Sequence, residues 1–98
     1  MAQIVQEGNR WQVSGAMTMP QVRTLLAESS ALLPTAETEI DLAGVSEVDT
    51  ATISLLFEWL RQAYARKSRL TFAHLPQNLT SLATLYGVLD FIPQSSSH

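Results

Sequence analysis

The chain contains no cysteine among its 98 residues, which excludes disulfides, thiol nucleophiles, iron–sulfur clusters and cysteine zinc sites. It also has no apolar run of the roughly 18 residues that a membrane span needs, and no basic-then-apolar signal pattern at its N-terminus. We therefore expect a cytoplasmic protein that does not insert into a membrane. Basic residues are few as well, six against nine acidic residues. Because a protein that neutralises nucleic-acid phosphates is normally basic, we expect no nucleic-acid partner.

The residues of common catalytic and metal sites are sparse and scattered. The four glycines lie far apart, so the chain has no phosphate-cradling glycine loop. His98 lies in the terminal tail, and His74 has no second histidine or acid at metal-ligand spacing. Ser46, Asp49 and His74 are the residue types of a nucleophilic triad, but such types occur by chance in most domains. We expect no enzyme activity, no cofactor, no metal site and no small-molecule substrate, and keep a small enzyme as a third alternative.

Apolar residues make up 46% of the chain, which is enough for the core of one domain. We expect this single domain over residues 1–93, followed by a polar, frayed tail at 94–98. The hydrophobic periodicity predicts strands at 3–6, 10–14, 38–42 and 70–73, helices at about 18–33, 50–67 and 76–87, a connection at 43–49, and a short apolar segment at 89–92 that could form a further strand. The order β-β-α-β-α-β-α predicts an α/β fold with a mixed sheet of four or five strands.

The helix predicted at residues 50–67 carries apolar side chains on two sides. At about 100° per residue, its predicted core stripe consists of Ile53, Leu56, Phe57, Leu60 and Tyr64. Two large apolar residues, Leu55 and Trp59, fall on the far side, beside Thr52, Gln62 and Arg66. Two interpretations of Trp59 are open: it packs against the following third helix, or it stays exposed as an anchor for a protein partner, since Trp and Arg are enriched at interface hot spots.

The pair Asp49-Thr50 stands where a loop is predicted to enter this helix. Either side-chain oxygen could cap the free N–H groups of the first turn, which contributes about 1 kcal/mol. The other interpretation is that the Thr50 hydroxyl is a phosphoacceptor. A phosphate there would place about −1.5 to −2 charges at the positive end of a helix and could switch a partner surface without refolding the domain.

The charges are unevenly distributed along the chain. Five of the nine acidic residues lie between Glu37 and Asp49, and four of the six basic residues lie between Arg61 and Arg69. This separation indicates either a solvated loop region followed by a basic helix C-terminus that complements the helix dipole, or a polarised surface that orients a partner.

The segment IDLAGVSEVDT at residues 40–50, followed by the apolar helix ISLL at 53–56, resembles the signature of STAS domains, the modules of sulfate transporters and anti-sigma-factor antagonists. In that family a strand that reads hydrophobic-Asp-Leu leads through a loop to Asp-Ser or Asp-Thr at a helix start. The resemblance implies a STAS-like fold whose usual last helix is absent, because only a few polar residues follow Pro93. The segment LATLYGVLDFIP at 82–93 and the small size further resemble the STAS subunits of phospholipid-transport ABC systems.

This resemblance implies a non-enzymatic cytoplasmic subunit, peripheral at the inner membrane, that binds and supports the ATPase of an ABC transporter maintaining outer-membrane lipid asymmetry. The residues that we expect to contact the ATPase are Thr50, Thr52, Leu55, Trp59 and Arg66, with Asp49 as the helix cap. The alternative is an anti-sigma-factor antagonist, a partner switch controlled by phosphorylation of Thr50. Many STAS domains have a small residue and then Gly after the Asp-Ser/Thr pair. This chain has Ala51-Thr52 there, which favours constitutive docking over recognition by a kinase.

Overall fold

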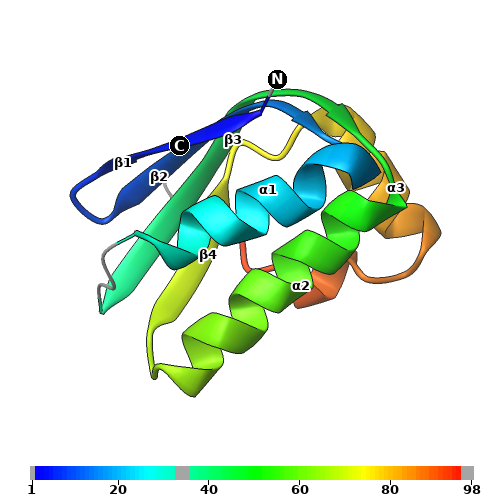
Figure 1. Cartoon of the computed structure of the whole chain (residues 1–98). Helices are drawn as coiled ribbons and strands as arrows, with labels where there is room; N and C mark the ends of the chain where they lie inside the picture. Colours follow the sequence, from blue (N-terminus) through cyan, green and yellow to red (C-terminus); the bar gives the residue numbers. More distant parts are fainter. Residues whose placement is uncertain (1, 33–35, 96–98) are drawn as a thin grey trace.

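The computed structural model describes residues 2–32 and 36–95 as one mixed sheet with helices packed on it (Figure 1). The strands are β1 (Gln3–Glu7), β2 (Arg10–Met17), β3 (Glu37–Val48) and β4 (Arg69–Ala73). The helices are α1 (Met19–Ser30), α2 (Thr50–Ala65) and α3 (Gln77–Leu85), followed by the short 3₁₀ helix η1 (Leu89–Phe91). The predicted α/β class and element order are therefore confirmed.

The sheet has the order β1-β2-β3-β4. β1 and β2 form an antiparallel hairpin, and Gly8 has a φ of 61° in its turn, a conformation that glycine adopts at no steric cost. β2, β3 and β4 pair in parallel. Each parallel pair is joined by a helix, which is the connection that parallel strands require.

β3 is longer than the sequence predicted. The connection expected at residues 43–49 continues as strand to Val48 and stays paired with β2, with two register shifts along the way. Gly44 lies inside this strand, and a Cβ atom there would come within 3.1 Å of the Ser14 Cβ and 3.2 Å of the Val13 carbonyl oxygen. Gly44 therefore allows β3 to come close to β2, and it does not form a turn.

The segment after α3 also differs from its prediction. Residues 89–92, which could have formed a strand, contain η1 instead. The chain then runs beside β4, where the Phe72 N–H donates to the Pro93 carbonyl over 2.9 Å and the Ser95 N–H donates to the Phe72 carbonyl over 2.7 Å. Gln94 and Ser95, the first residues of the predicted frayed tail, are thus ordered against β4, while 96–98 lie outside the described residues. No helix follows η1 as far as Ser95.

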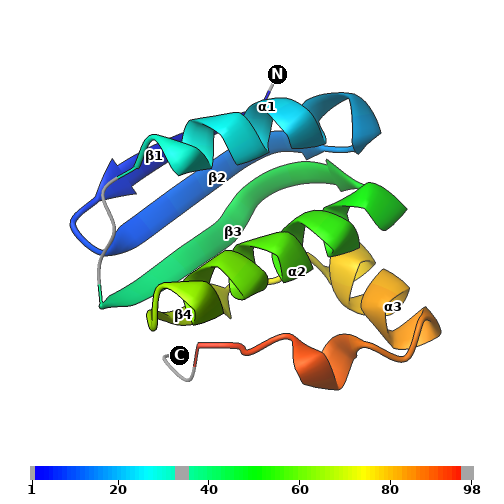
Figure 2. The same ribbon diagram turned by 60° about the horizontal axis from the view of Figure 1, so that its bottom comes forward.

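The helices α1 and α2 lie side by side on one face of the sheet (Figure 2). The core fills the space between these layers and is formed by Val13, Met17, Leu25, Ile40, Leu42, Leu55, Leu56, Trp59, Leu70, Phe72 and Leu79. α3 contacts both α2 and η1. In the part of the chain that the structure describes, no helix is both long enough and apolar enough to cross a membrane.

Candidate functional site

The first turn of α2 is fixed by a reciprocal capping arrangement. Asp49 is the N-cap residue, and its carboxylate accepts a hydrogen bond of 2.9 Å from the Ala51 N–H. The Thr52 hydroxyl oxygen accepts from the Asp49 N–H over 3.0 Å. Two of the N–H groups that a helix start leaves without partners are satisfied in this way.

The same two side chains connect α2 to the rest of the fold. The second carboxylate oxygen of Asp49 accepts from the Met19 N–H, 3.0 Å away at the start of α1. The Thr52 hydroxyl donates to the Met17 carbonyl at the end of β2 and is completely buried. The start of α2, the start of α1 and the end of β2 are therefore held in one arrangement.

Thr50 is the first residue of α2, and its side chain is exposed. The capping bonds come from Asp49 and Thr52, so Thr50 is not part of the cap. Its hydroxyl stands at the positive end of the helix dipole. In chemical terms it can donate or accept a hydrogen bond to a partner, or accept a phosphoryl group.

The expected exposure of Trp59 and Leu55 is wrong: they are only 2% and 1% exposed. The Trp59 indole N–H donates to the Ser29 hydroxyl of α1 over 2.8 Å, and its ring meets Trp11 edge-on with 5.8 Å between ring centroids. Trp59 therefore packs against α1 and β2, not against the third helix. The physical reason is that α2 covers the sheet and flanks α1 at the same time, which buries a wider sector of the helix than a sheet contact alone. Thr52 lies in the same buried sector.

Most residues that were predicted to form the core stripe of α2 lie instead on the outer side of the helix, away from the core. Leu56 is fully buried as expected, but Ile53, Phe57 and Leu60 are only partly buried, and Tyr64 is 86% exposed. Arg66, the C-cap residue of α2, is exposed at the end opposite Thr50. The structure thus leaves Thr50 and Arg66 at the surface, about 24 Å apart at 1.5 Å per residue, and places the other three predicted contact residues in the core.

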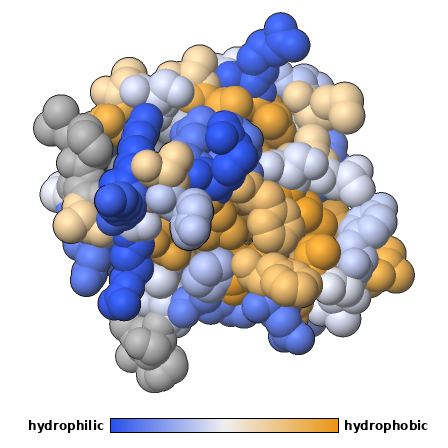
Figure 3. Space-filling view, turned by 90° about the horizontal axis from the view of Figure 1, so that it is seen from below, coloured by the Kyte–Doolittle hydropathy of each residue, from blue (hydrophilic) through white to orange (hydrophobic). Residues whose placement is uncertain are grey.

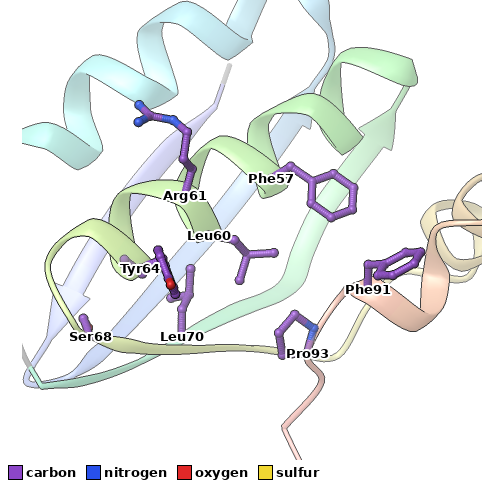
Figure 4. Close-up of a pocket in the computed structure, with 9 residues that line it drawn as sticks. Phe57, Leu60, Arg61, Tyr64, Ser68, Leu70, Phe91 and Pro93 are labelled. Carbon is purple, nitrogen blue, oxygen red and sulfur yellow. The ribbon is translucent and has the colours of Figure 1, made fainter.

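The outer side of α2 forms one wall of an open groove of about 480 Å³. Figure 4 shows this α2 groove with Phe57 and Leu60 on α2, and with Phe91 and Pro93 on the opposite wall. Its full lining is Phe57, Leu60, Arg61, Ala63, Tyr64, Ser68, Leu70, Phe91 and Pro93. On the face that includes α2 and η1, apolar side chains gather into a continuous region bordered by polar ones (Figure 3). Patches of this kind on soluble proteins mark interaction surfaces.

A second polar cluster connects three strands and was missed by the sequence analysis. Arg10 on β2 forms ion pairs with Glu39 and Asp41 on β3, and the His74 Nδ1 lies 3.0 Å from the other Asp41 oxygen. His74 itself has a φ of 58°, directly after β4. These residues lie far apart in the sequence, so only the strand register that pairs Asp41 with Ala73 could have placed His74 there.

The environment of Asp41 strongly favours its charged form. Burial by itself would raise the pKa of Asp41, but hydrogen bonds from the Ala43 N–H, Arg10 and His74 outweigh it and lower the pKa to about 2. The cluster is thus a structural ion pair with an exposed histidine at its edge. Within residues 2–32 and 36–95, no group of three histidine or acidic side chains could hold a metal ion.

Comparisons with known proteins agree with this architecture. The family model described as "Mlab, STAS domain" matches residues 2–93. No curated protein matches the chain significantly. Among solved structures, the anti-sigma factor antagonist SpoIIAA in its unphosphorylated form is similar, with a TM-score of 0.74, 12% sequence identity, and coverage of 99% of this chain and 90% of that one. At this identity the likeness shows the fold alone.

Proposed function

Because this chain belongs to the STAS domain family, by a family model of the MlaB type over residues 2–93, we propose that it is a non-enzymatic subunit of an ABC phospholipid-transport complex. In this role it binds the ATPase of the complex from the cytoplasmic side of the inner membrane and supports its activity, and the complex maintains outer-membrane lipid asymmetry. Family membership carries the proposal, since STAS domains act in general through protein–protein contacts.

The first turn of α2 supports a docking role. Asp49 and Thr52 fix the backbone of this turn, while Thr50 is exposed on it. A rigid surface loses little entropy when a partner binds, which favours affinity. We therefore place the ATPase contact at Thr50 and along the exposed side of α2, and not at Thr52, Leu55 or Trp59, which the core encloses.

The surface stripe that follows Thr50 supports the same placement. At about 100° per residue, Thr50 lies on the same side of α2 as Ile53, Phe57 and Tyr64. A partner that contacts Thr50 can therefore continue along partly exposed apolar side chains. In this view Trp59 acts indirectly, since it holds α2 against α1 through the hydrogen bond to Ser29.

The proposal is tested by co-purification with the ATPase of an ABC phospholipid-transport system from the same organism. The tagged ATPase is expected to retain the wild-type chain, and Thr50→Arg to reduce retention roughly tenfold or more, as at an interface hot spot. Thr24→Arg is the matched control, because Thr24 is also an exposed helical threonine, on α1. A wild-type chain that the ATPase does not retain would refute the proposal.

The second candidate function is a phosphorylation-controlled anti-sigma-factor antagonist. It is favoured by one observation, the exposed hydroxyl of Thr50 at a helix N-terminus whose cap does not use it. Incubation with the cognate kinase and ATP, read by intact mass, separates the two candidates. Gain of one phosphate on Thr50 would favour the switch, and an unchanged mass favours docking. A gene neighbourhood with a kinase and a sigma factor, in place of a permease and an ATPase, would also favour the phosphorylation switch.

A further inference from the structure

The two outer strands of the sheet differ in what lies beside them. In the order β1-β2-β3-β4, the outer strands are β1 and β4 (Figure 1). The edge of β4 is covered by the chain itself, because Phe72 forms two backbone hydrogen bonds with the segment 93–95. In the part of the chain that the structure describes, β1 pairs only with β2. The outer edge of β1 is therefore the place where a further strand can join the sheet.

β1 lacks the features with which proteins usually protect an edge strand. Such strands carry lysine or other charged residues, contain proline, or are bent by a bulge. The sequence of β1, QIVQE, has no proline and no lysine, and its register with β2 is regular from Gln3 to Glu7. Its one charged residue, Glu7, lies at the end of the strand beside the turn. A regular strand with so little charge is suited to pair with another strand.

Val5, the middle residue of β1, exposes an apolar side chain at this edge. It is 44% exposed, and it is the only strand residue among the exposed large apolar side chains of the described chain. Ile4 packs against the core, and because side chains alternate along a strand, Val5 lies on the sheet face away from the helices. Its neighbours on that face, Gln3, Glu7 and Gln12, are polar. A strand added to β1 would cover this isolated apolar side chain.

The residues of β1 are complementary to a second copy of β1 that runs in the opposite direction. When Val5 lies opposite Val5 of the second copy, Gln3 of each copy lies opposite Glu7 of the other. The Gln3 amide can then donate a hydrogen bond to the Glu7 carboxylate, and the apolar side chains meet at the centre. Parallel pairing would instead place Glu7 against Glu7, and like charges opposite each other are destabilising. Charge and hydropathy therefore both favour an antiparallel, two-fold symmetric pair.

We infer that two copies of this chain associate through β1, so that their four-stranded sheets join into one continuous sheet. The contact uses five strand residues from each copy, far fewer than the roughly 20–30 residues a side of a standard interface. The dimer is therefore weak and forms at high protein concentration. The inference uses neither Thr50 nor the α2 groove, so it is independent of the proposed function.

Amide hydrogen exchange of the wild-type chain tests the pairing without any substitution. A two-residue turn joins Glu7 to Arg10, and the residues on either side of such a turn form a hydrogen-bonded pair. Because hydrogen-bonded and non-hydrogen-bonded pairs alternate in an antiparallel ladder, the Val5 N–H points to β2 and the Ile4 N–H to the outer edge. We expect exchange at Ile4 to slow as protein concentration rises, and exchange at Val5 to stay nearly constant. An Ile4 rate that does not depend on concentration would overturn the inference.

Sedimentation equilibrium of the full chain, at concentrations up to roughly 1 mM, measures the association directly. We expect a growing dimer fraction for the wild type and an association constant at least roughly tenfold lower for Val5→Lys, which sets two ammonium groups opposite each other. The matched controls are Tyr64→Lys and Leu85→Lys, which charge exposed apolar residues on the helices and should leave the association constant unchanged.

The exposure of Val5 predicts that Val5→Lys keeps the unfolding midpoint of the wild type, so its effect is not due to unfolding. A wild-type chain that stays monomeric over this range would overturn the inference. So would a dimer that Tyr64→Lys or Leu85→Lys disrupts while Val5→Lys does not, because the contact would then lie on the helices.

Discussion

The two sides of α2 carry similar residue types in opposite surroundings. On the inner side, Leu55 and Trp59 are sealed against α1 and the sheet. On the outer side, Phe57, Leu60 and Tyr64 border an open groove. The difference shows that an apolar stripe on a helix does not by itself identify the core. When a helix has a second helix as neighbour, the direction of that neighbour decides which stripe is buried.

The contrast between the two sides of α2 predicts that the largest loss of stability comes from Trp59→Ala, on the inner side. Removing a buried indole, together with its hydrogen bond to Ser29, is expected to lower the free energy of unfolding by about 3 to 5 kcal/mol. The measurement is urea denaturation followed by circular dichroism, with Trp59→Phe as the control that keeps most of the packing. A loss below about 1 kcal/mol would show that the inner side of α2 is not the core.

A smaller effect on stability is expected for the cluster of Arg10, Asp41 and His74, where the carboxylate of Asp41 is held by ion pairs. The pKa of Asp41 is about 2 in the folded chain, below its ordinary value of 3.8, so the carboxylate stabilises the fold above about pH 4, and this stabilisation is lost as pH falls toward 2. We expect the wild type to lose about 1 to 2 kcal/mol more than Asp41→Asn over this range, after allowance for solvent screening. Denaturation of both chains at several pH values measures the difference, and equal pH slopes would contradict it.

The smallest change in the free energy of unfolding is expected for a substitution on the outer side of α2. Tyr64→Ser should change the free energy of unfolding by less than about 0.5 kcal/mol, because the side chain is 86% exposed and has little packing to lose. The same denaturation experiment measures it beside Trp59→Ala. A destabilisation above about 2 kcal/mol would place Tyr64 in the core and remove one wall of the groove.

Much of the fold and part of the candidate site could be predicted from local sequence features. The turn at Gly8 and the end of the third helix before Gly87 depend on neighbouring residues, and both glycines have positive φ in the structure. Asp49 at the start of α2 is also a local signal, since an N-cap needs only the next few residues. β3 was predicted too short because Gly44 was interpreted as a loop residue, although it permits a close approach to β2.

The sequence by itself determined the order of strands and helices, the site of the α2 cap at Asp49, the turns at Gly8 and Gly87, and the resemblance to STAS domains, because these depend on residues close together in the chain. Only the tertiary structure decided which side of α2 is buried, how Arg10, Asp41 and His74 meet, and that Phe91 faces α2 across a groove. These contacts join residues separated by about 30 positions or more. They depend on where strand pairing and helix packing bring distant segments together, and no local pattern encodes that.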